Sequence, residues 1–235
     1  MKVVFVGPTV PQAETLFPGL RVAPPARQGD LMRAVKEGVT GIGLIDGFFE
    51  HTPAVWHKEI LFALSEGVRV AGAASMGALR AAECAAFGMQ PIGTIAQSYL
   101  DGTRLDDADV AQSHAPAELG YLPLSEPLVN VEACLQQLLR TVDISAAEHD
   151  LLLRSARALF FKDRTWRRII DTSGVMQEPG AGILLRRILQ MDCNLKRQDA
   201  LLLLESVAGW PSKRVEKPDA WKIQQMQGFA PVGKS

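Results

Sequence analysis

The chain has 235 residues, of which 47% are hydrophobic and 22% are charged, and its formal net charge at pH 7 is −1. This composition is typical of a globular protein with a sizeable core, and the near-neutral charge argues against general nucleic-acid binding. No run of about 18 apolar residues occurs, and the N-terminus lacks a signal-peptide cleavage site. We therefore expect a cytoplasmic protein with no membrane contact.

Short apolar runs alternate with helical patterns over the first part of the chain. The alternation predicts strands at residues 3–6, 20–23, 41–45 and 68–72, and helices at residues 10–17, 29–37, 53–66 and 78–87. Thr52 is predicted to cap the helix at 53–66, with Pro53 in its first position. The pattern predicts an α/β fold, a mainly parallel sheet with flanking helices that is Rossmann-like in the N-terminal half.

The second half of the chain has a different pattern. Loops or short elements are predicted at residues 94–127, and helices follow from Leu128. We expect an α/β core over 1–127 that holds the site, a helical region over 128–210 packed on the core, and a polar tail over 211–235. Acidic side chains are in excess before residue 129 and basic ones after it, which favours contacts with other proteins.

Ser75 is the main candidate nucleophile. Ligands of parallel sheets bind beyond the carboxyl ends of the strands, where the turns at 7–9, 46–48 and 74–77 should meet. Residues 73–77, AASMG, approximate the A-x-S-x-G form of a nucleophile elbow, which presents a serine at a helix N-terminus. The alternative is that Ser75 only caps the helix, which is a common role for serine.

Backbone donors near Ser75 are candidates for an oxyanion site. The N–H of Met76 is the natural first donor, because the N–H groups of a first helical turn lack intrahelical partners. A second donor is expected near Thr9, in the turn that begins at Gly7. Small residues such as Gly77 would let a substrate approach the backbone closely.

A serine nucleophile needs a base, and Lys58 is the preferred candidate. On a helix over 53–66 its neighbours would all be apolar, and the loss of hydration would lower its pKa. The alternative is a surface lysine that extends into solvent. His57 is the best placed of the four histidines, although a lone histidine is more often structural. Arg80 and Glu83 form a surface pair, or Arg80 orients an anionic substrate.

No metal or cofactor is predicted. The sequence has no P-loop and no dinucleotide fingerprint, and none of its three cysteines has metal-ligand spacing. The cysteines are interpreted as free thiols. An acidic cluster is interpreted as a solvated loop; its members are Asp101, Asp106, Asp107 and Asp109.

Residues 44–89, LIDGFFEHTPAVWHKEILFALSEGVRVAGAASMGALRAAECAAFGM, resemble the core of the TfuA-like family. The similarity extends from VVFVGPT to DDADV, and the motifs DGFF, WHKEI and SMGALRAAE are specific in combination. TfuA-like proteins accompany YcaO enzymes, which activate peptide amides with ATP. Together they replace an amide oxygen of a precursor peptide with sulfur.

The resemblance implies two activities. The protein would help YcaO engage its peptide, and it would hydrolyse a thiocarboxylated, ubiquitin-like (ThiS-like) sulfur carrier to release sulfide. A Ser-Lys pair is associated with this hydrolysis, and the matching positions are Ser75 and Lys58. Any cofactor would belong to the YcaO partner.

Two other functions stay open at this point. The first is a non-enzymatic scaffold that binds YcaO and the peptide, which the uneven charge and the basic tail favour. The second is a generic serine esterase or amidase, which the elbow-like turn would serve equally well.

Overall fold

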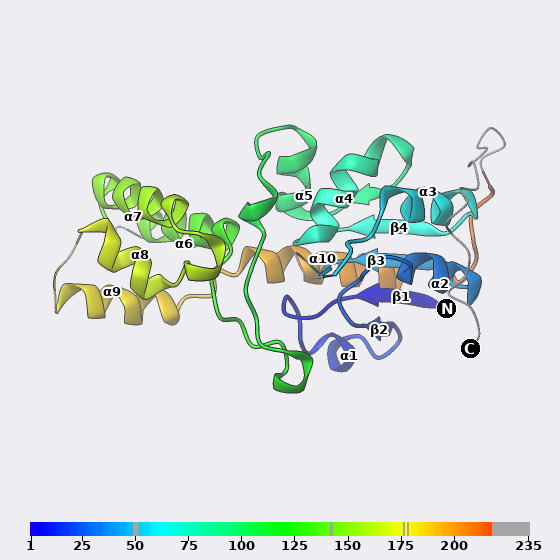
Figure 1. Ribbon diagram of the computed structural model, residues 1–235, viewed down its shortest axis with the longest axis horizontal. Helices are drawn as coiled ribbons and strands as arrows, with labels where there is room; N and C mark the ends of the chain where they lie inside the picture. The colour runs from blue at the N-terminus through cyan, green and yellow to red at the C-terminus, as the bar shows by residue number, and fades with distance from the viewer. Residues whose placement is uncertain (49–51, 142, 176, 178, 218–235) are drawn as a thin grey trace.

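The computed structural model describes residues 1–48, 52–141, 143–175, 177 and 179–217, and its centre is one parallel sheet (Figure 1). The sheet has the strand order β2-β1-β3-β4-β5. The strands are β1 (Lys2–Phe5), β2 (Arg21–Ala23), β3 (Gly41–Leu44), β4 (Arg69–Gly72) and β5 (Gln90–Pro91). The predicted α/β class with a parallel sheet is confirmed. This order is that of flavodoxin-like sheets, whose topological switch point lies between β1 and β3.

Helices cover both faces of the sheet. Side chains of β1 alternate between the faces, with Val3 and Phe5 on one and Val4 on the other. The first face packs against α2 (Asp30–Lys36), α3 (His57–Ser65) and α4 (Met76–Cys84). The second face packs against α1 (Ala13–Leu16) and α10 (Leu195–Gly209), the last helix in the described part of the chain. Figure 1 shows α10 returning to the sheet.

Four helices that follow the strands in the sequence and precede α10 pack into a core of their own. They are α6 (Leu128–Arg140), α7 (Ala146–Ala158), α8 (Trp166–Ser173) and α9 (Gly180–Leu189), while α5 (Gly93–Leu100) packs on α4. Ser145 caps α7, accepting from the Glu148 N–H at 3.3 Å, and its own N–H donates to the Glu148 carboxylate at 2.7 Å. Among the described helices, none has the length and hydropathy that crossing a bilayer requires.

Helix α3 begins at His57, so the predicted start at Pro53 and the predicted cap at Thr52 are wrong. Long-range hydrogen bonds hold the preceding segment out of the helix. The Pro53 carbonyl accepts from Gln28 N at 2.9 Å, and the Val55 carbonyl accepts from Arg80 Nε at 3.0 Å. Local helix signals cannot reveal such partners, which is why the sequence placed the start too early.

Residues 211–217 of the predicted tail pack on the α/β core, and residues 218–235 lie outside the described part of the chain. The Arg214 guanidinium donates to the carbonyls of Val35 at 2.8 Å and Val39 at 3.0 Å. The Val215 N–H donates to the Gly67 carbonyl at 2.8 Å. The start of the tail is therefore held at the ends of α2 and α3.

Candidate functional site

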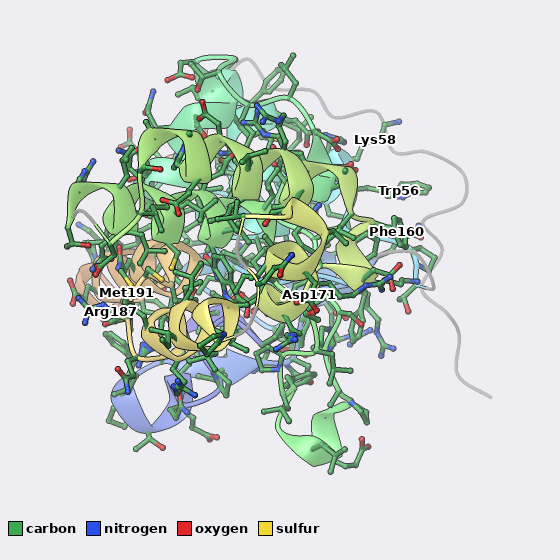
Figure 2. The ribbon with its side chains drawn as sticks, turned by 90° about the vertical axis from the view of Figure 1, so that its left-hand side faces the viewer. Trp56, Lys58, Phe160, Asp171, Arg187 and Met191 are labelled. Carbon is green, nitrogen blue, oxygen red and sulfur yellow. The ribbon has the colours of Figure 1, made fainter. Side chains whose placement is uncertain are left out.

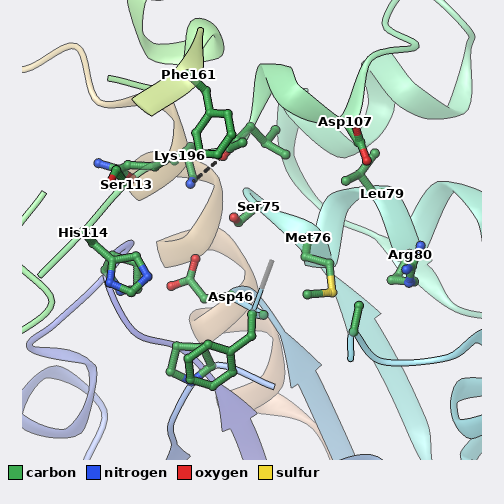
Figure 3. A pocket seen from close by; sticks show the side chains of 18 of the residues that line it. Asp46, Ser75, Met76, Leu79, Arg80, Asp107, Ser113, His114, Phe161 and Lys196 are labelled. Atoms are coloured by element: carbon green, nitrogen blue, oxygen red, sulfur yellow. Dashed lines mark hydrogen bonds between the residues drawn. The ribbon is translucent and has the colours of Figure 1, made fainter. Parts of the chain in front are cut away.

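A cavity of about 580 Å³ lies beyond the carboxyl ends of β1, β3 and β4 (Figure 3). The turns after these strands contribute Pro8, Asp46 and Ser75 to its wall. The cavity is also lined by Asp107, by residues 110–114, by Phe161 and Lys162, and by Lys196 at the start of α10. The three turns therefore meet as the sequence predicts, at the edge where parallel sheets bind their ligands.

Ser75 lies between β4 and α4 and points into this cavity (Figure 3). Ala74 just before it has a φ of 65°, in the left-handed region that few residues other than glycine adopt. The Ser75 N–H donates to the Ala73 carbonyl at 2.8 Å. The side chain makes no capping hydrogen bond, although Ser75 occupies the N-cap position. The hydroxyl is thus left for the cavity rather than used by the helix.

The backbone donors around Ser75 are not equivalent. The Met76 N–H has no hydrogen-bond partner in the part of the chain that the structure describes, so it can donate to an oxyanion. The Gly77 N–H already donates to the Ile45 carbonyl at 3.0 Å, and Gly77 does not line the cavity. Gly77 instead allows α4 to approach β3, because a Cβ there would lie 1.8 Å from the Leu44 carbonyl oxygen.

The predicted donors near Thr9 are committed to another group. The Asp46 carboxylate accepts from Gly7 N at 2.8 Å, Thr9 N at 3.0 Å and Thr9 Oγ1 at 2.6 Å. Gly7 and Thr9 are buried and do not line the cavity. The expectation that this turn supplies an oxyanion donor is therefore wrong. Its role is to hold Asp46, whose carboxylate faces the cavity.

Replacing Asp46 with asparagine is expected to lower the free energy of unfolding by about 1–3 kcal/mol, because one of the two carboxylate oxygens that accept from these donors becomes an NH2 group, which cannot accept. Urea unfolding followed by circular dichroism measures the change. Asp107→Asn is the control, since Asp107 lines the same cavity and is exposed. Equal stability of the two variants would contradict a role for Asp46 in holding the turn.

Lys58 and His57 do not line the cavity, and both residues are exposed. Figure 2 shows the Lys58 side chain at the surface. Because α3 begins at His57, two of the expected apolar neighbours of Lys58 are not on the helix. The predicted apolar environment of Lys58 is therefore wrong. His57 Nε2 lies 2.7 Å from the Glu83 carboxylate. The Ser75–Lys58 pair stays a prediction without geometric support.

Arg80 does line the cavity, but its guanidinium is already engaged. Its Nε donates to the Val55 carbonyl, and its Nη1 donates to Glu83 at 2.6 Å. The predicted pairing of Arg80 with Glu83 is confirmed. An anionic substrate would have to compete with Glu83 for this guanidinium.

Lys196 is a cavity residue that the sequence analysis missed. It is the second residue of α10, only 2% of it is exposed, and its Nζ donates to the Val110 carbonyl at 3.0 Å. Burial lowers the pKa of the Lys196 ammonium, while Asp46 and Glu126 act in the opposite direction. Figure 3 shows Lys196 and Asp46 on either side of the Ser75 side chain.

The signal for Lys196 was present in the sequence. Along α10 it falls on the same stripe as Ala200, Leu203, Leu204 and Val207, all of them buried. A lysine within an apolar stripe is the feature that had been assigned to Lys58.

No group of three His, Cys, Asp or Glu side chains that could hold a metal ion occurs within the described ranges.

The fold and the cavity define a doubly wound α/β protein with a serine at the switch-point edge. The family model described as TfuA-like protein matches residues 46–165, and the chain belongs to this family. TfuA-like proteins are associated with YcaO-dependent peptide thioamidation. A search of curated proteins finds no match to this chain. The matched segment contains Ser75 and ends before Lys196.

Proposed function

We propose that this protein hydrolyses a thiocarboxylated, ubiquitin-like sulfur carrier and supplies the released sulfide to a YcaO partner, with Ser75 as the nucleophile. One observation carries the proposal. The Ser75 hydroxyl is not used to cap α4 and points into a cavity, beside the Met76 N–H at the helix N-terminus, which has no partner among the described residues. A nucleophile next to an oxyanion donor is the arrangement that acyl transfer requires.

The reaction has two stages. Ser75 Oγ attacks the thiocarboxylate carbonyl carbon, its proton passes to a base, and the Met76 N–H donates to the developing oxyanion. Collapse of the tetrahedral intermediate breaks the carbon–sulfur bond and expels hydrosulfide, which leaves the carrier esterified to Ser75. Water then attacks the ester, and the carrier departs with an ordinary carboxylate.

The size of the cavity supports a substrate that enters as an extended chain. A volume of about 580 Å³ accommodates a ligand of drug-like size and not a folded domain. A carrier would therefore insert its C-terminal residues while its folded body stays outside. The exposed side chain of Phe160, which precedes the lining residue Phe161 in the sequence, is available for contact with the body of a carrier or with YcaO.

The proposal is tested with the purified protein and a carrier protein that bears a C-terminal thiocarboxylate. We expect sulfide release in proportion to conversion of the carrier to the carboxylate, measured by intact-protein mass spectrometry, with no YcaO and no ATP present. A carrier that keeps its thiocarboxylate at the spontaneous rate would contradict hydrolysis. Turnover of simple phenyl esters far faster than that of the carrier would instead indicate a generic esterase.

A further inference from the structure

We infer that Lys196, from helix α10, is the base that accepts the Ser75 proton. The inference rests on the proposed function for its substrate, but it concerns the activation of Ser75 itself. Lys196 and Ser75 line the same cavity, and their side chains point into the same space (Figure 3). Only 2% of Lys196 is exposed, and it lies close enough to Asp46 for the two charges to interact.

The protein holds the backbone of Lys196 with a dedicated set of hydrogen bonds. The Lys196 N–H donates to Asn130 Oδ1 at 3.0 Å, and Asn130 Nδ2 donates to Asn194 Oδ1 at 3.1 Å. Asn194 also caps α10, accepting from Arg197 N at 2.9 Å. This network ties α6 to the start of α10 and fixes where the lysine enters the cavity, which is the kind of support that a functional side chain requires.

The surroundings of Nζ favour the neutral amine. Burial removes water from the ammonium and lowers the pKa of Lys196. The position in the first turn of α10 acts in the same direction, because a helix N-terminus disfavours a cation. Asp46 and Glu126 are the charges that oppose these effects. The remaining charged groups on the cavity wall are Arg80, Glu83, Asp107, His114 and Lys162.

A neutral Lys196 has the hydrogen-bonding capacity that a base needs. One of its N–H groups donates to Val110 O, and the lone pair of Nζ is left to take the proton of Ser75 as Oγ attacks. The resulting ammonium gives its proton to the departing sulfur, which leaves as hydrosulfide. In the second stage Nζ takes a proton from water and returns one to Ser75 Oγ. No hydrogen bond joins Ser75 to Lys196 in the described residues, and catalytic contacts are often longer before substrate binds.

The test uses a fluorophosphonate probe, which reads serine activation without the thiocarboxylate. Ser75 Oγ forms a bond to phosphorus, fluoride leaves, and the hydroxyl proton goes to the base. We expect Lys196→Met to lower the rate of Ser75 labelling by about 10²–10⁴-fold. The matched control is Lys58→Met, which removes an exposed lysine from the motif next to the site and should keep the rate within about twofold of the parent.

The dependence of labelling on pH separates a base from a structural lysine. In the parent protein the rate should rise with pH and level off at an apparent pKa below about 10.4, the value of a lysine in water. Lys196→Arg should stay slow, since arginine does not lose its proton. In Lys196→Ala, added methylamine should restore part of the rate in proportion to free amine. The first of these readouts does not depend on the stability of any variant, because it uses the parent protein.

The outcomes distinguish this inference from the proposed function. Parental labelling rates in Lys196→Met, or loss of labelling in Lys58→Met alone, would overturn the role of Lys196 and leave Ser75 as the nucleophile. Failure of Ser75 to label in the parent, together with no sulfide release from the carrier, would overturn the proposed function. Labelling that depends on Lys196 without sulfide release would leave the serine–lysine pair standing and reject only the thiocarboxylate substrate.

Discussion

Replacing Ser75 with alanine is expected to lower the rate of sulfide release from the thiocarboxylated carrier by at least about 10³-fold, because the covalent route is lost entirely. The residual rate would come from binding and from the Met76 N–H, which the substitution leaves in place. Sulfide is measured as a function of time under single-turnover conditions, so that binding and chemistry are separated. A rate within threefold of the parent would remove Ser75 from the mechanism.

The same variant distinguishes a nucleophile from a helix cap through its stability. Because the Ser75 side chain makes no capping bond, Ser75→Ala should change the free energy of unfolding by less than about 0.5 kcal/mol. Ser145→Ala is the matched control, since Ser145 does cap α7. That variant should lose about 1 kcal/mol and keep full activity. A loss of similar size in Ser75→Ala would favour the capping role.

Adding free sulfide separates hydrolysis from the second expected role, helping YcaO engage its peptide. If both roles exist, Ser75→Ala should support YcaO-dependent thioamidation when sulfide is supplied and fail when only the carrier is present. Thioamide formation that requires the intact serine even with free sulfide would contradict this separation.

Replacing Gly77 with alanine is expected to destabilise the protein by more than about 3 kcal/mol, at the upper end of overpacking effects. The added Cβ would lie 1.8 Å from the carbonyl oxygen and 2.5 Å from the carbonyl carbon of Leu44, which are backbone atoms of the sheet. They cannot move aside without disturbing β3. Helix α4 would have to shift away from the sheet, and the N–H of Gly77 would lose its acceptor, Ile45 O.

Urea unfolding measures this effect, with Gly209→Ala as the control. Gly209 is the last residue of α10, and nothing lies within 4 Å of a Cβ built there. The control should leave stability unchanged or slightly raised, because alanine is the better helix former. A Gly77→Ala variant as stable as the Gly209→Ala variant would show that α4 does not depend on this close approach. Since Ser75 begins the same turn, its labelling rate should fall as well.

The α/β class and the place of Ser75 could be predicted because the signals that specify them are local. The strands and the turn at residues 73–77 can be predicted from the residues within them, and parallel sheets bind ligands at one edge. The start of α3 could not be predicted, because Pro53 and Val55 bond to residues that are far away in sequence. Because α3 is shorter than predicted, two of the apolar neighbours expected for Lys58 are not on its helix.

The lysine of the site illustrates the same limit. A lysine in an apolar stripe occurs at two places in the sequence, at Lys58 and at Lys196. Only the packing of α10 on the sheet shows that Lys196 is the buried one. The roles of Gly7 and Thr9 also depended on a contact between two turns, because Asp46 takes the donors that had been expected to serve a substrate. Contacts between residues that are far apart in the sequence, rather than residue type, decide which groups reach the cavity.

Rapid quenching during turnover shows directly whether Ser75 forms an ester with the carrier. The protein is mixed with thiocarboxylated carrier, quenched in acid at short times and analysed by mass spectrometry. We expect a covalent adduct of the two chains linked through Ser75 Oγ, formed together with the first released sulfide and absent in Ser75→Ala. Sulfide released at an equal rate by the parent and by Ser75→Ala, with no adduct at any quench time, would contradict the role of Ser75 as the nucleophile.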